Sequence, residues 1–189
     1  MIVVFRRTGE RRYSVEAQRP GFPDVMMNPA PGYDALIPHD LMHLVVEAQL
    51  GLKRGIFGQL AAGAGTFQLA VKDGESSREV ARTRRRLATR GKKSMKAGRD
   101  ECLQSERATY ICRHEWLARS ASRAERKESH TMNDQAASVR GVAGAEELHA
   151  LDRKKMDDIC DRLDEFSARW SSLAVGESMA IAWPDLSVS

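Results

Sequence analysis

The sequence has little cysteine, few aromatic residues and no long apolar run, and each shortage excludes a class of protein. Its 189 residues include three cysteines, which lie far apart and form no C-x-x-C pair. This usage argues against a disulfide framework and indicates a reduced compartment. Because no stretch of 18 apolar residues is present, we expect no membrane-spanning helix and no membrane partner.

The first residues also lack the features of a secretory leader. Met1–Phe5 are followed at once by two arginines, too soon for the apolar core of a signal peptide. We therefore expect a cytoplasmic protein. At 42% hydrophobic and 30% charged residues, the composition is that of an ordinary globular chain, and its length predicts a single domain spanning residues 1–189.

The hydrophobic periodicities predict an α+β fold with a small antiparallel sheet. Residues 2–7 and 11–18 have the alternation of a hairpin around Thr8-Gly9-Glu10, and residues 177–183 form a strand expected to pair with it. The connection 19–37 contains four prolines, so neither a helix nor a central strand is expected there.

Helices are predicted over residues 38–50, 56–62, 76–126 and 145–173, with a break in the third near Gly91 or Gly98. The two long ones are expected to be antiparallel, joined by a flexible linker at 129–144. Apolar residues of the last helix recur at spacings of three and four, the pattern of a helix-packing seam: Met156, Ile159, Leu163, Phe166, Trp170 and Leu173. Such a seam could also join a protein partner or a second copy in a homo-oligomer.

The segment 38–50 carries the main candidate site. Wound as a helix, it is apolar around most of its circumference, which is typical of a buried helix. The remaining arc holds His39, Asp40, His43 and Glu47, with no Lys or Arg among them. This ionisable stripe is expected to face a cleft or an internal site.

One interpretation of the stripe is a metal site. His39 and His43 have the i, i+4 spacing of a helical zinc pair, and Asp40 stands where zinc proteases carry a glutamate base. His39 and Glu47 are separated by about 12 Å along the axis, so they cannot share one ion. Zinc or another divalent metal would therefore need further ligands, for which His114 and Glu115, or Asp34, are the candidates.

Two other interpretations stay open. Without a metal, His43, Glu47 and Asp40 could act as a catalytic acid–base group, with Glu47 orienting His43. Alternatively the stripe is purely structural, because an acidic residue such as Asp40 favours the first turn of any helix. The functional hypothesis is a metal-binding or histidine-based hydrolase-like protein, and whether it is an enzyme stays undecided.

A second candidate is the basic segment 82–96. Arg84, Arg85, Arg86, Lys92 and Lys93 could neutralise phosphates in a weak nucleic-acid contact, which would make the chain a binding or regulatory module. No aromatic residue lies between Ser76 and Ala108, so no stacking platform is expected. The alternatives are a solvated helix face, or a structural and interaction protein without catalysis.

The block Pro38-His-Asp-Leu-Met-His43, followed by Val46-Glu47 and Gly55-Ile-Phe-Gly58, resembles a group of small uncharacterised bacterial proteins. Their shared segment reads Pro-His-Asp-Leu-x-His, then Val-Glu, then Gly-x-Phe-Gly, and the resemblance spans roughly residues 29–67. It implies a bacterial cytosolic protein and brings no activity with it.

Overall fold

The computed structural model describes residues 1–71, 74–120 and 151–188, which form an antiparallel sheet with helices packed against it. The sheet order is β4-β3-β2-β1-β5. The strands are β1 (Ile2–Gly9), β2 (Arg12–Gln18), β3 (Val25–Met27), β4 (Gln68–Leu69) and β5 (Ser178–Ala182). The helices are α1 (His39–Leu50), α2 (Ile56–Ala61), α3 (Ser77–Ala97), α4 (Arg99–Ala118) and α8 (Arg153–Ser172). The predicted α+β fold is confirmed.

One face of the sheet is apolar and buried. Phe5 on β1 stands opposite Val15 on β2 and Met179 on β5, and Val3 is flanked in the same way by neighbouring buried residues. The strands therefore alternate as expected, and the predicted pairing of the hairpin with a strand near residue 180 is confirmed.

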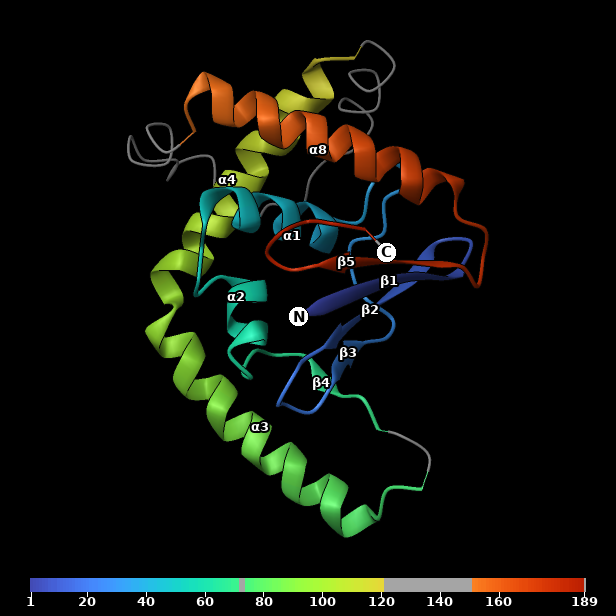
Figure 1. Cartoon of the computed structure of the whole chain (residues 1–189), viewed down its shortest axis with the longest axis vertical. Coiled ribbons are helices and arrows are strands. Elements are labelled where there is room, and N and C mark those ends of the chain that lie inside the picture. Colours follow the sequence, from blue (N-terminus) through green and yellow to red (C-terminus); the bar gives the residue numbers. More distant parts are fainter. Residues whose placement is uncertain (72–73, 121–150, 189) are drawn as a thin grey trace.

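Helix α1 lies between this sheet and the helices α4 and α8 (Figure 1). It begins after Pro38 and ends at Gly51, whose φ of 66° is the left-handed conformation that favours glycine at a helix end. Residues 40–46 of α1 are all buried. Because α1 is packed on both sides, most of its polar arc faces neighbouring elements, and only His39 at its start is exposed.

Helix α8 crosses the end of α4 (Figure 1), where Trp116 donates to Asp164 and Arg119 to Asp157. Five of the predicted seam residues on α8 are buried: Met156, Ile159, Leu163, Phe166 and Trp170. Cys112 and Cys160 are buried as well, and the cysteines are free. Within the described part of the chain, no helix is long and apolar enough to cross a membrane.

The structure differs from the predicted elements at β3 and at the start of α8, and it confirms the predicted break in the long helix. The connection 19–37 contains a short strand, β3, because residues between Pro23 and Pro29 are free of proline and include three apolar side chains. The long helix is broken at Gly98 and runs through Gly91. Helix α8 begins at Arg153, while the first part of the predicted helix and the linker 129–144 lie outside the described residues.

Two glycines bring α3 and α4 close to the body of the protein. A Cβ on Gly91 would lie 2.7 Å from the carbonyl oxygen of Gly65, and a Cβ on Gly98 would lie 2.6 Å from that of Arg54. These distances leave no room for a side chain, so glycine sets how closely α3 packs.

Replacing Gly91 should therefore destabilise the protein. Alanine normally stabilises a helix interior by about 1 kcal/mol relative to glycine. In Gly91→Ala, the clash of the new methyl group with the Gly65 carbonyl should outweigh this stabilisation. The free energy of unfolding, measured in urea, should therefore fall. Thr89→Ala, an exposed change on the same helix, is the control and should unfold at or above the original midpoint. A more stable G91A protein would contradict the close contact.

Candidate metal centre

The polar arc of α1 divides between two neighbours. His39, His43 and Glu47 turn toward α4, whereas Asp40 bonds to the sheet. Because the apolar side chains of α1 occupy the core, the i, i+4 spacing of the histidines fixes them side by side on this arc.

His39 and His43 converge with Glu106 of α4. Nε2 of His43 lies 3.0 Å from Nε2 of His39 and 3.4 Å from a carboxylate oxygen of Glu106. The three ligand atoms all lie within 4.8 Å of one another. Two imidazoles and a carboxylate in this arrangement form a group that could hold a metal ion.

Glu47 is fully buried and holds three donors. Its carboxylate accepts from the backbone N–H of Ile56 at 2.7 Å, from that of Phe57 at 2.9 Å and from the Ser105 hydroxyl at 2.7 Å. The first two donors open α2, whose own N-cap residue, Gly55, offers no side chain. Glu47 thus caps α2 from a different helix, and Gly55 leaves the space that its carboxylate fills.

The same network decides the tautomer of His43. Ser105 has one hydroxyl hydrogen, which it donates to Glu47, so its oxygen can only accept from Nδ1–H of His43 at 2.9 Å. Thr109 Oγ1 lies 3.3 Å from the same nitrogen. With Nδ1 protonated, the lone pair of neutral His43 is on Nε2, which faces His39 and Glu106. A buried carboxylate acting through Ser105 therefore orients this imidazole, as outer-shell groups do in metal sites.

The charges at the three ligand groups are unequal. Burial lowers the pKa of His43, but the hydrogen bond to Glu106 and the nearby carboxylates outweigh it, and the net shift is upward. Burial, followed by repulsion from His43, lowers the pKa of His39 to about 4. The hydrogen bond from His43 lowers the pKa of Glu106 despite partial burial. Pairing with Glu106 therefore favours the protonated form of His43, whereas burial favours the neutral form of His39.

Asp40 lies apart from this group. Its carboxylate accepts from the Tyr13 hydroxyl at 2.5 Å, and Tyr13 also contacts the carbonyl of Pro31. Burial raises the pKa of Asp40, partly offset by the Tyr13 hydrogen bond. This position joins α1 to β2 and favours an anchoring role over the general-base role that the sequence motif predicts.

The further ligands expected from α4 are not the ones in the cluster. His114 and Glu115 lie eight and nine residues after Glu106, about 12 Å further along the helix. The ring of His114 packs against Tyr110 at 4.3 Å between centroids, and Glu115 forms an ion pair with Arg119. Asp34 instead pairs with Arg113. The residue of α4 that lies next to His39 and His43 is Glu106 rather than His114 or Glu115.

No protein-family model, curated protein or solved structure matches this chain.

Sequence reasoning missed Glu106, Ser105 and Thr109. One signal was available, because Ser105 stands in line with Ala108, Cys112 and Trp116 on the buried face of α4. A hydroxyl at a core position needs a buried partner. Glu106 gave no signal of its own, since it is one of many carboxylates on charged helices.

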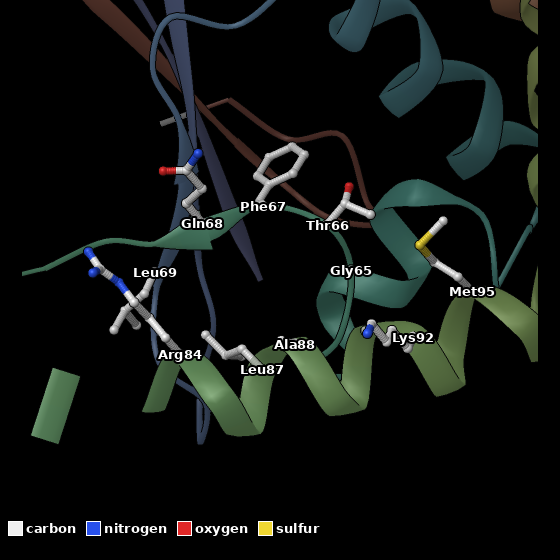
Figure 2. Close-up of a pocket in the computed structure, with 11 residues that line it drawn as sticks. Gly65, Thr66, Phe67, Gln68, Leu69, Arg84, Leu87, Ala88, Lys92 and Met95 are labelled. Carbon is white, nitrogen blue, oxygen red and sulfur yellow. The ribbon is translucent and has the colours of Figure 1, made fainter. Parts of the chain in front are cut away.

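The residues of the basic segment lie on α3, away from the histidines. Arg84, Arg85, Arg86, Lys92 and Lys93 are all exposed. Arg84 and Lys92 also line an open, mostly apolar hollow of about 450 Å³ between α3 and residues 65–69 (Figure 2). The hollow includes Leu87 and Met95 but none of the three clustered ligands.

The role of Glu47 can be tested by a single substitution. Glu47→Gln keeps the shape but replaces one acceptor oxygen by an NH₂ group, so a backbone N–H of α2 or the Ser105 hydroxyl loses its partner. We expect a loss of about 1–3 kcal/mol in the free energy of unfolding, measured in urea. Glu10→Gln, at an exposed turn, is the matched control and should change nothing. Equal midpoints for both variants would contradict the capping role.

Proposed function

We propose that His39, His43 and Glu106 bind a divalent metal ion, with zinc as the expected ion, and that the site performs metal-assisted hydrolysis. The proposal is carried by the convergence of three possible ligand atoms, one each from His39, His43 and Glu106. The buried Glu47 and Ser105 orient the ring of His43 so that its Nε2 atom faces the other two residues.

The distances support this proposal. Ligands bonded to zinc at about 2.0–2.2 Å in a tetrahedral site lie about 3.3–3.6 Å apart. The 3.4 Å contact of His43 Nε2 with Glu106 falls in that range, and its 3.0 Å contact with His39 Nε2 is shorter by a few tenths of an ångström, which a small rotation of the His39 ring would restore. The Glu106 side chain is 49% exposed, so it can rotate to complete the geometry.

The accessibility of the ligands supports an open coordination position. His43 is buried, but His39 and Glu106 reach the surface, so water can approach the metal from that side. Three protein ligands plus one water are typical of catalytic zinc sites, where the metal lowers the pKa of the water to about 7. The chemistry that such a site supports is attack of hydroxide on a carbonyl or phosphoryl centre.

The metal-free alternative has less support. In a hydrolytic triad, the histidine lies between the serine and the acid, and the serine faces the substrate. Here Ser105 lies between His43 and Glu47 and is fully buried, so its hydroxyl is inaccessible. Glu47 is equally buried. Both residues are placed to support His43 rather than to contact a substrate.

Metal binding is the first test. Protein purified without chelators should contain about one equivalent of zinc or a similar ion by elemental analysis, and the apo protein should bind zinc in calorimetry. His39→Ala, at an exposed position, should abolish this binding without unfolding the chain. Ser105→Ala should weaken it by about 10–100-fold, the usual cost of losing an outer-shell partner.

His114→Ala is the matched control, because this histidine is on the same helix as Glu106 but outside the cluster. It should bind zinc as the original protein does. The proposed metal site would be overturned if the purified protein contains no metal and the H39A substitution leaves its affinity for zinc unchanged. If the protein binds one equivalent of zinc but shows no chelator-sensitive cleavage of model esters or phosphoesters, the metal site is supported and the proposed hydrolase activity is overturned.

Zinc affinity should also depend on pH in a defined direction. The pKa of His43 is raised above its ordinary value of 6.5, so a proton occupies Nε2 below that raised pKa. Zinc must displace this proton, and its affinity should fall as the pH falls through the pKa. Calorimetry in buffers of different ionisation enthalpy should detect proton release near pH 6. Affinity that is flat from pH 6 to 9 would show that His43 is not a ligand.

A further inference from the structure

Helix α3 presents one face to the protein and the rest to solvent. The less exposed side chains recur as Val80, Thr83, Leu87, Gly91 and Ser94, a single stripe along the helix. At 100° per residue, these positions fall within about 80° of one another. This stripe packs toward residues 65–69, which include β4, and the opposite side of α3 faces away from the sheet (Figures 1 and 2). At the edges of that side, Lys92 lines the hollow next to residues 65–69, and Arg82 and Arg86 line another next to residues 22–24.

The outward side of α3 is almost entirely basic. Helix α3 contains nine Lys or Arg residues against one acidic residue, Glu79. Seven of the nine fall in an arc of about 120° opposite the buried stripe, and we call them the basic face: Arg78, Arg82, Arg85, Arg86, Lys92, Lys93 and Lys96. All seven side chains belong to exposed residues, and the face extends for about 27 Å.

Ion pairs do not hold the basic face within the described structure, although Arg82 and Arg86 line a hollow together with the carboxylates of Asp24, Glu75 and Glu79. Across residues 1–71, 74–120 and 151–188, none of the basic-face residues forms an ion pair. The other two cations of α3 lie outside the 120° arc: Arg90 lies over the ring of Phe22, and Arg84 lies on the side of the hollow, which Lys92 at the edge of the basic face also borders. Seven like charges on one helix face repel one another, which a polyanion would relieve.

We propose that the basic face of α3 binds double-stranded DNA through its phosphate backbone. An α-helix fits the major groove of B-form DNA, whereas the major groove of duplex RNA is too narrow for it. Single strands are bound with the help of aromatic stacking, and α3 has no aromatic residue. This inference concerns a different surface from the proposed metal centre and is independent of it.

An anionic membrane fits the basic face less well. Membrane-binding helices insert bulky apolar residues on the side facing the lipid. On α3 the large apolar residues Val80 and Leu87 belong to the inward stripe, and Met95 lies at its border. The basic face itself is interrupted only by small residues such as Ala81 and Thr89.

The packing of α3 makes this face rigid enough to act as a unit. The close contact between Gly91 and Gly65 holds the middle of the helix against the body, and the capping bond from Glu79 N–H to Ser76 fixes its start. The charges are therefore displayed on one ordered rod rather than on a flexible tail, and several can engage successive phosphates together.

Fluorescence anisotropy of the full chain with a labelled DNA duplex of about 20 base pairs tests the proposal. We expect binding at low salt, with log K falling linearly against log salt by about 0.9 for each phosphate contacted. Arg82→Gln/Arg85→Gln/Lys93→Gln should reduce that slope by about 2–3 and weaken binding at least about tenfold. Arg85→Gln alone should reduce the slope by about one.

The matched control removes three exposed charges from elsewhere, as Arg11→Gln/Arg12→Gln/Lys53→Gln, and should retain most of the affinity and slope. Circular dichroism should show all variants folded, as expected for exposed positions. No binding at low salt, an equal loss in the control, or tighter binding to duplex RNA, single-stranded DNA or phosphatidylserine vesicles would each overturn the proposal.

Discussion

The buried carboxylate of Glu47 is the constraint on which this part of the structure depends. Removing an ionised group from water is costly unless hydrogen bonds replace the lost solvation. Here the replacements come from two elements, because α2 supplies two backbone N–H groups and α4 supplies the Ser105 hydroxyl. Satisfying one carboxylate therefore fixes where α2 begins and how α4 lies against α1.

The orientation of His43 is a by-product of the same arrangement. Once the Ser105 hydrogen is directed at Glu47, the proton of His43 must be on Nδ1. Asp40 is engaged separately with Tyr13 of β2 in the first turn of α1, so the two buried acids of this helix attach it to different layers. The helix that carries the candidate ligands is also the one whose position is most strongly determined by polar bonds.

The sequence predicted those features that local patterns determine. The hairpin and α1 have strong periodicities, and their predicted limits agree with the structure to within a few residues. Helix α8 ends within one residue of the predicted position, but it begins at Arg153 instead of residue 145. The histidine pair followed from spacing on one helix. Glu106 could not be predicted, because its approach to His43 depends on how α4 crosses α1, and no local pattern encodes that crossing. Strand β3 was missed for a similar reason, since three residues become a strand only through their neighbours.

The order of strands in the sheet has a consequence for how the protein is made. β1 lies between β2 and β5, and Phe5 of β1 pairs with Met179 of β5. One edge of β1 therefore pairs with a strand that lies roughly 170 residues later in the chain. Contacts so distant in sequence form late and slow folding. On the ribosome, the β1–β2 hairpin would be synthesised long before β5. Until then its open, apolar edge would be a place where nascent chains can aggregate or bind a chaperone.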